Sequence, residues 1–277
     1  MEQTFKIMRK LLAFLLFSST IVAQITLTTI PLPKEIEETS GLERRGDLFI
    51  THNDSGDEPR IYFFTEDGKI VKSIEFFTMK NKDWEDIAAD ENHYYIADTG
   101  NNFATRENLR IYILDSDFNY EGVIKIKYAA QTTFSKESLN EYDAEALAVV
   151  GEELILFSKN RKTLQSALYR IPKTPGEYTL RPETFLATNA LVTAADYNPA
   201  LDLMVLTGYT FNGDQFFYTL KDFVKRGWEN LELKRYLIPV KPAQIEAVKI
   251  DTTSRFWITS ESEEKGTPRL FLLELKE

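Results

Sequence analysis

The stretch Trp84-Glu85-Asp86-Ile87 belongs to a short motif that occurs five times along this 277-residue chain. The other copies are Thr39-Ser40-Gly41-Leu42, Ala144-Glu145-Ala146-Leu147, Ala194-Ala195-Asp196-Tyr197 and Ile245-Glu246-Ala247-Val248. Between the second residues of successive copies the spacings are 45, 60, 50 and 51 residues. Repeats of roughly 40 to 50 residues are typical of β-propeller blades. The longer second copy contains an extra stretch at residues 132–140.

Each copy also contains further strand-like segments. A second apolar segment lies at residues 47–51, 93–97, 154–157, 203–207 and 255–259. A third, aromatic or β-branched segment lies at residues 60–64, 110–114, 167–171, 215–220 and 269–273. These compositions are typical of strands. Fourth strands are clear only at residues 122–128 and at residues 70–74, which follow the hairpin turn Asp67-Gly68.

The repeats predict an all-β fold, with residues 24–277 forming one five-bladed β-propeller. Residues 25–30 are left over before the first copy, and we expect them to complete the last blade, because closure of the ring protects its edges. A six-bladed propeller, with a degenerate blade at residues 231–240, is the alternative. Residues 220–228 predict a short helix, since their apolar side chains fall on one face.

Residues 1–23 have the order of a secretory signal peptide. Lys6, Arg9 and Lys10 precede an apolar run at residues 11–17, and small residues follow it. The apolar stretch is shorter than the roughly 20 residues that a membrane span needs. We therefore expect an exported protein, periplasmic or extracellular, without integral membrane association. The chain contains no Cys, which excludes disulfides, thiolate catalysis and cysteine-based metal sites.

The chain is acidic, and its charge limits the classes of partner that we expect it to bind. Removal of residues 1–23 takes away three basic residues and one acidic residue, so the net charge changes from −10 to −12. Such a surface repels the phosphates of nucleic acids and anionic lipids. A cation, a small molecule or an exported protein partner fits better, and we expect a monomer.

The unusual residues gather on one face of the predicted propeller, because the inner strands start where the second strands end. Glu85, Glu145 and Glu246 occupy equivalent positions around the channel. Three carboxylates that point at one axis, about 6 to 7 Å apart, would repel one another by roughly 2 to 3 kcal/mol per pair. A metal ion held by the three glutamates would relieve this repulsion, and hard oxygen ligands favour Ca²⁺, with Mg²⁺ as the alternative. Capping of neighbouring strands, pairing with basic side chains and a catalytic role are the other interpretations.

The loops on the same face add candidate ligand-binding residues. These are His52, Asn53, Asp54, Asp98, Asn101, Lys159, Arg161 and Asp196. The stretch at residues 52–57 combines an imidazole, an amide, two carboxylates and a hydroxyl around a glycine. An ordinary Asx turn has the same composition, so the structural interpretation stands beside the functional one.

The sequence contains none of the common catalytic motifs G-x-S-x-G, G-x-G-x-x-G, H-E-x-x-H or a phosphate-binding P-loop. Our first hypothesis is a propeller that binds a divalent cation, a small ligand or both at its acidic mouth. The second is a metal-dependent hydrolase of phosphoesters or lactones, with Glu85 or Asp98 as base and Arg161 or His52 stabilising the developing anion. The third is a structural or protein-interaction module.

The opening copy also resembles a known family. Residues 38–42, 47–54, 60–62 and 67–69 look like the first blade of the SdiA-regulated propeller proteins. Residues 83–88, 96–102 and 144–147 are similar to exported phytase-like propellers described as having esterase-like activity. The resemblance implies a propeller with calcium at its mouth, held by Glu85, Glu145 and Glu246. Ala195 and Ser40 stand at the ring position in the fourth and first copies, where this chain departs from the pattern.

Overall fold

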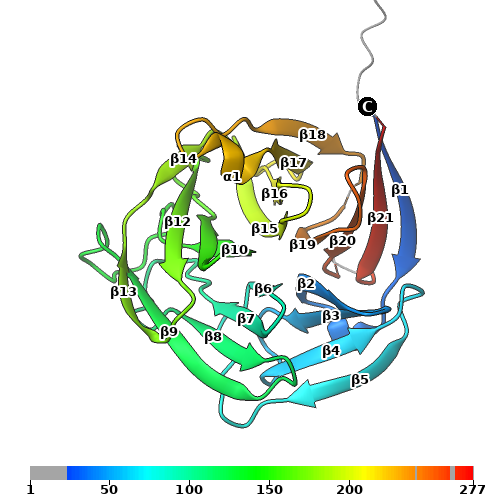
Figure 1. Ribbon diagram of the computed structural model, residues 1–277, viewed down its shortest axis with the longest axis horizontal. Coiled ribbons are helices and arrows are strands. Elements are labelled where there is room, and N and C mark those ends of the chain that lie inside the picture. Colours follow the sequence, from blue (N-terminus) through cyan, green and yellow to red (C-terminus); the bar gives the residue numbers. More distant parts are fainter. Residues whose placement is uncertain (1–23, 241, 263–265, 277) are drawn as a thin grey trace, which may run out of the picture.

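The computed structural model describes residues 24–240, 242–262 and 266–276, which form five sheets arranged in a ring around a central channel (Figure 1). This arrangement is a five-bladed β-propeller, as the repeats predict. The proposed signal peptide at residues 1–23 lies outside the described residues. Within the described part of the chain, none of the helices has the length and apolar character needed to cross a membrane.

The blades follow the sequence copies, each with its first strand innermost. Blade 1 contains β2 (Thr39–Arg45), β3 (Leu48–Asn53), β4 (Arg60–Phe64) and β5 (Ile70–Glu75). Blade 2 contains β6 (Asp86–Ala89), β7 (His93–Asp98), β8 (Arg110–Asp115), β9 (Tyr120–Tyr128) and an added β13 (Gly176–Leu180). Blade 3 contains β10 (Ala144–Val150), β11 (Glu153–Ser158), β12 (Ser166–Pro172) and β14 (Thr184–Leu186).

The last two blades complete the ring. Blade 4 contains β15 (Leu191–Asn198), β16 (Leu203–Tyr209), β17 (Gln215–Lys221) and β18 (Lys234–Ile238). Blade 5 contains β19 (Ile245–Ile250), β20 (Arg255–Ser260), β21 (Arg269–Lys276) and β1 (Gln24–Pro31). β1 pairs antiparallel with β21, and Figure 1 shows these two strands side by side in the same blade. The prediction that residues 25–30 close the last blade is confirmed.

The six-bladed alternative is wrong, and the helix expected at residues 220–228 is shorter than predicted. Residues 231–240 do not form a sixth blade, because β18 within them pairs with β17 as the outer strand of blade 4. The expected helix at residues 220–228 is reduced to α1 (Phe223–Arg226), since Leu220 still belongs to β17. α1 ends at Arg226, because the next residue, Gly227, has a φ of 73°, which is not helical. A 3₁₀ turn, η1 (Lys34–Ile36), connects β1 to blade 1.

The hydrophobic core lies between the blades. Each of five buried clusters joins one pair of neighbouring blades, so burial holds the ring together all the way round. Trp84, for example, is fully buried between blades 1 and 2, and Trp257 lies between blades 1 and 5. These tryptophans are therefore part of the core.

Buried polar contacts fill the channel between the inner strands. The Asp86 carboxylate accepts hydrogen bonds from the backbone N–H of Leu147, at 2.8 Å, and of Ala195, at 3.2 Å. Asp86 thus ties blade 2 to the inner strands of blades 3 and 4. Further along the channel, Lys249 Nζ lies 2.7 Å from Glu43 Oε1 and 2.9 Å from Asp196 Oδ1. These contacts link the inner strands below the mouth.

Candidate functional site

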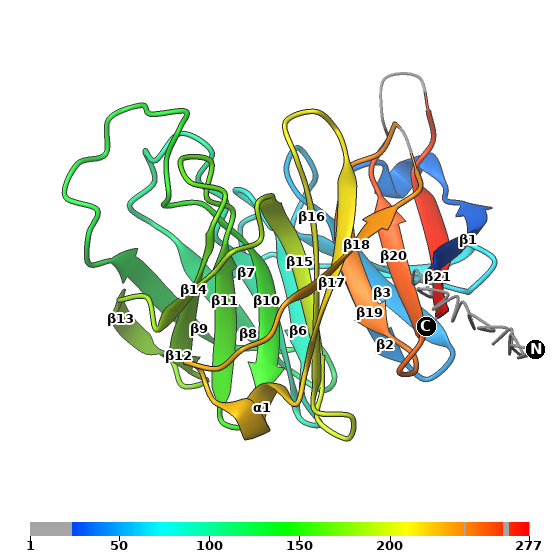
Figure 2. The ribbon, with the colours of Figure 1, turned by 90° about the horizontal axis from the view of Figure 1, so that it is seen from above.

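The mouth of the channel contains a polar cavity of about 250 Å³. It lies on the face where the inner strands start, which is the upper side of Figure 2, where β10 begins. Six carboxylates and two basic side chains line it: Glu38, Asp54, Glu85, Glu145, Glu246, Glu261, Lys159 and Arg161. The three predicted ring glutamates, Asp54, Lys159 and Arg161 are therefore brought together.

Two of the ring glutamates lie where the register of the inner strand pairs shifts. The β10–β11 register shifts between Ala144 and Ala146, so Glu145 is an extra residue without a partner across the pair. The same shift at Ile245 and Ala247 makes Glu246 the extra residue of β19. A β-bulge of this kind redirects the inserted side chain, here toward the channel mouth.

A similar bulge in blade 4 shows that the fourth sequence copy was misaligned. In β15 the register shifts between Val192 and Ala194, which puts Thr193 at the ring position. The sequence alignment that placed Ala195 there was wrong by two residues, because a bulge leaves no signature in the composition. Asp196 is therefore displaced along β15 toward Lys249, and it does not line the mouth cavity.

One group of mouth carboxylates is neutralised by basic side chains. Glu85, Asp143 and Glu145 each place a carboxylate oxygen within 4.8 Å of the other two. Lys159 contacts the Glu145 carboxylate, and Arg161 contacts Asp143 and lies 3.8 Å from Glu145 Oε1. Burial acts to lower the pKa of Lys159, but Glu145 and Glu246 outweigh it and hold that pKa well above its usual value. Lys159 therefore stays charged beside Glu145.

A second group of carboxylates has no such partner among the described residues. Glu38, Asp54 and Glu261 also place oxygens within 4.8 Å of one another. In the described part of the chain, no lysine or arginine forms an ion pair with them. Glu261 Oε2 accepts a hydrogen bond of 2.9 Å from the Gln244 amide. Burial, followed by repulsion from Glu246, Asp54 and Glu38, raises the pKa of Glu261 to about 10.

Glu246 lies in the same cavity but belongs to neither group. Burial raises its pKa to about 7, with Lys159 opposing the shift and Asp54 adding to it. This carboxyl therefore changes its charge close to neutral pH.

His52 and Asp98 do not line the mouth cavity. The His52 ring is fully buried against Trp84, with ring centroids 5.4 Å apart, and burial lowers its pKa to about 4. Asp98 is held by Arg106, whose Nη2 lies 2.7 Å from Asp98 Oδ1, and more loosely by Arg110. Both residues therefore stabilise the fold from the ends of their strands.

The two candidate asparagines also make structural contacts. Asn53 donates hydrogen bonds to the Glu35 carbonyl, at 3.0 Å, and to the Asp57 carboxylate, at 2.9 Å. Asn101 donates one of 3.0 Å to the Tyr142 carbonyl. The amides of both side chains thus order the loops around the mouth.

Sequence reasoning missed Glu38, Glu261 and Asp143. A positional signal was available for Glu261, which is the first residue after β20, just as Asp54 follows β3 and Lys159 follows β11. In blades 1, 3 and 5 the residue after the second strand therefore lines the mouth, and comparing this position across the copies would have found Glu261.

The comparisons with known proteins support the fold and do not indicate a family or an activity. No protein-family model matches the chain, and no curated protein matches it. The PQQ-bound aldose sugar dehydrogenase of Streptomyces coelicolor is similar over 91% of this chain and 99% of that chain, with 10% identity and a TM-score of 0.54. A DUF4623 family protein of Bacteroides eggerthii is similar over 92% and 76%, with 10% identity and a TM-score of 0.47. The chain thus shares its β-propeller fold with the dehydrogenase, a protein of distant sequence.

Proposed function

We propose that this protein is an exported β-propeller that binds a divalent cation at its mouth through Glu38, Asp54 and Glu261. The observation that supports this is the spacing of the three carboxylates, within 4.8 Å, without a basic partner among the described residues. The three glutamates expected from the sequence are a less suitable set, because Lys159 and Arg161 already neutralise Glu145.

Electrostatics favours a cation at this position. At an effective dielectric of 20, two carboxylates about 5 Å apart repel by roughly 3 kcal/mol. Either protons or a cation relieve this repulsion, and the raised pKa of Glu261 shows its tendency to take a proton in the absence of a cation. Ca²⁺ accepts six to eight oxygen ligands in irregular arrangements, whereas Mg²⁺ needs near-octahedral geometry. We therefore favour Ca²⁺, with Mg²⁺ as the alternative.

The remainder of the cavity provides a place for a small ligand. Lys159 and Arg161 line it beside the proposed cation site and present positive charge to an anionic or polar group. The resemblance to SdiA-regulated and phytase-like propellers stays a prediction and is compatible with this role.

A second candidate function is hydrolysis of a phosphoester or a lactone. The observation that favours it is Glu246, whose pKa of about 7 suits a general base, in the same cavity as Lys159 and Arg161. A bound cation would supply Lewis acidity, and the two basic side chains would stabilise the developing anion. Neither base proposed from the sequence fits as well, since Asp98 is held by Arg106 and burial and nearby carboxylates raise the pKa of Glu85 well above its usual value.

Thermal melts in chelator and in added Ca²⁺ or Mg²⁺ test the cation site. We expect Ca²⁺ to raise the melting temperature saturably, as any ligand specific for the native state does. Glu261→Gln should abolish the shift, and Glu91→Gln, a change at an exposed residue, should preserve it. Absence of a shift in the unmodified chain contradicts the proposal. Phosphoester and lactone turnover, with and without Ca²⁺, decides between binding and hydrolysis.

A further inference from the structure

A second pocket lies at the junction of blades 2 and 3, where the chain departs twice from the blade repeat. The first departure is the connection between β9 and β10, which includes the extra stretch at residues 132–140. The second is β13, which leaves blade 3 and pairs in parallel with β9 of blade 2. The pocket has a volume of about 220 Å³ and shares no lining residue with the channel mouth.

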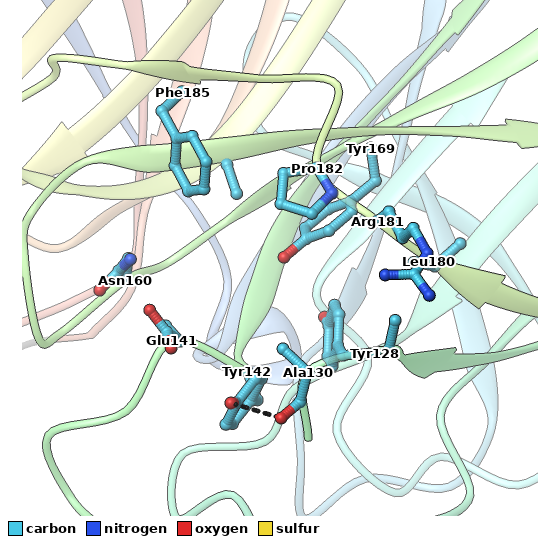
Figure 3. A pocket seen from close by; sticks show the side chains of 12 residues that line it. Tyr128, Ala130, Glu141, Tyr142, Asn160, Tyr169, Leu180, Arg181, Pro182 and Phe185 are labelled. Atoms are coloured by element: carbon cyan, nitrogen blue, oxygen red, sulfur yellow. Dashed lines mark hydrogen bonds between the residues drawn. The ribbon is translucent and has the colours of Figure 1, made fainter. Parts of the chain in front are cut away.

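One wall of the pocket is aromatic (Figure 3). The ring centroid of Tyr128 lies 5.7 Å from that of Tyr142 and 5.3 Å from that of Tyr169, so the three tyrosine rings adjoin one another. Phe185, which is 55% exposed, adds a fourth ring and leaves the pocket accessible from solvent. The faces of such rings attract cations, and quaternary ammonium groups in particular.

The Tyr169 hydroxyl has no protein partner. Tyr169 is 5% exposed, and its hydroxyl makes no hydrogen bond among the described residues. Figure 3 shows this oxygen pointing into the pocket. Burial, followed by the negative charge of Glu141, raises the pKa of Tyr169, so the hydroxyl stays protonated and can donate. An unpaired buried hydroxyl costs free energy, and a ligand that accepts its hydrogen bond would relieve that cost.

Two side chains of opposite charge line the pocket without a close ion-pair partner. Arg181 is exposed and forms no ion pair in the described part of the chain. Glu141 has a distant partner in Lys162, whose Nζ lies 4.0 Å from Glu141 Oε1 and whose side chain is 56% exposed. Figure 3 shows Glu141 and Arg181 on opposite sides of the pocket. A ligand with one positive and one negative group would therefore find a partner for each.

The walls of the pocket are held in place without a ligand. The Ala129 N–H donates a hydrogen bond of 2.9 Å to the Leu180 carbonyl, which joins the two departures from the repeat. Asn160 Oδ1 accepts hydrogen bonds from the N–H groups of Lys162, at 3.0 Å, and Thr163, at 2.9 Å, and so orders the loop after β11. A preformed pocket loses little conformational entropy on binding.

We propose that this pocket binds a small zwitterion with a quaternary ammonium group and a carboxylate, of the betaine class. The methylated ammonium would lie against the tyrosine rings beside Glu141, and the carboxylate would accept hydrogen bonds from Arg181 and the Tyr169 hydroxyl. A quaternary ammonium has no N–H to donate, so aromatic faces and one carboxylate suffice to bind it. A cavity of roughly 150 Å³ holds benzene, and the larger volume here suits a molecule of the size of glycine betaine.

The test is calorimetric titration of the full chain with three probes. Glycine betaine carries both charged groups. The tert-butylacetate anion has carbon in place of the quaternary nitrogen and keeps the carboxylate, whereas tetramethylammonium keeps the cation and lacks the carboxylate. We expect one glycine betaine to bind per chain, and each of the two partial probes to bind about tenfold more weakly.

Two variants test the contacts. Arg181→Gln should weaken binding of glycine betaine about tenfold, because it removes the charged partner of the carboxylate. Glu141→Gln should weaken glycine betaine severalfold and should not weaken tert-butylacetate, which has no positive group. Lys82→Gln and Glu91→Gln, the matched changes at exposed residues outside the pocket, should leave binding unchanged.

Thermal melts of the variants show whether they are folded. Arg181→Gln and Glu141→Gln should both melt close to the parent, because neither side chain has a close ion-pair partner among the described residues. The proposal is overturned if glycine betaine does not bind, if either partial probe binds as tightly as glycine betaine, or if either of these two variants binds glycine betaine as tightly as the parent.

Discussion

Replacing Lys159 by Met should destabilise the protein strongly and in a pH-dependent way. The Lys159 side chain is 6% exposed and its ammonium contacts Glu145, which is 3% exposed. The ammonium also lies 5.0 Å from the centre of the Tyr209 ring. In the Lys159→Met variant, Glu145 keeps only Arg161, whose Nη2 lies 3.8 Å from Glu145 Oε1.

The size of the effect follows from Glu145, which must then be either charged and buried or protonated. Burial raises the pKa of Glu145 well above the usual 4.5, and Lys159 is the strongest influence that opposes this rise. Keeping a carboxyl protonated costs about 1.4 kcal/mol for each pH unit above that value. Part of this cost is already present in the parent, so the loss should be at most about 5 kcal/mol at pH 8 and stay below about 1 kcal/mol at pH 5.

Urea unfolding of the parent and the variant at both pH values measures this loss. The double variant with Glu145→Gln should recover most of the stability at pH 8, because no buried charge remains. Lys125→Met removes an ion pair between exposed side chains, with Glu177 at 2.8 Å, and serves as the control with little expected change. A Lys159→Met variant as stable as the parent at pH 8 would refute the pairing.

Two further predictions concern the channel. Without a cation, stability should fall from pH 5 to pH 8. Glu246 contributes up to about 3 kcal/mol of this fall, because its pKa, raised to about 7 in the fold, lies near 4.5 when unfolded, and the native state holds the extra proton in between. Glu261, whose pKa is raised to about 10, adds to the fall. Chelator-treated urea melts across this range measure it, and a rise would contradict the assignment. Asp86→Ala should cost about 2 to 4 kcal/mol, since it leaves the N–H groups of Leu147 and Ala195 without their acceptor. An unchanged urea midpoint would show that Asp86 is dispensable.

Much of the architecture could be predicted because each blade repeats the same burial pattern. Strand composition located the first three strands of every copy, and the leftover residues 25–30 had to close the ring. Pairing between distant segments was harder. β13 joins blade 2 through a parallel contact with β9, and neither strand's composition indicates its partner.

The site residues that belong to the repeated motif could be predicted from the sequence. Those whose position depends on the register of strand pairing could not. Glu85, Glu145 and Glu246 stood out because the motif recurs, and all three line the mouth. Their electrostatic state depends on Lys159, which reaches Glu145 from the neighbouring strand of the same blade. Glu38 lies just before its strand, outside the motif, and its proximity to Glu261 arises only when blades 1 and 5 close the ring.

Calcium titration of the chelator-treated full chain by calorimetry, with elemental analysis, tests the central claim most directly. We predict one Ca²⁺ per chain through Glu38, Asp54 and Glu261. Binding should release protons, detectable in buffers of different ionisation enthalpy, because the pKa of Glu261 is raised to about 10 in the absence of a cation. No binding heat and no bound metal, with either Ca²⁺ or Mg²⁺, would contradict the account.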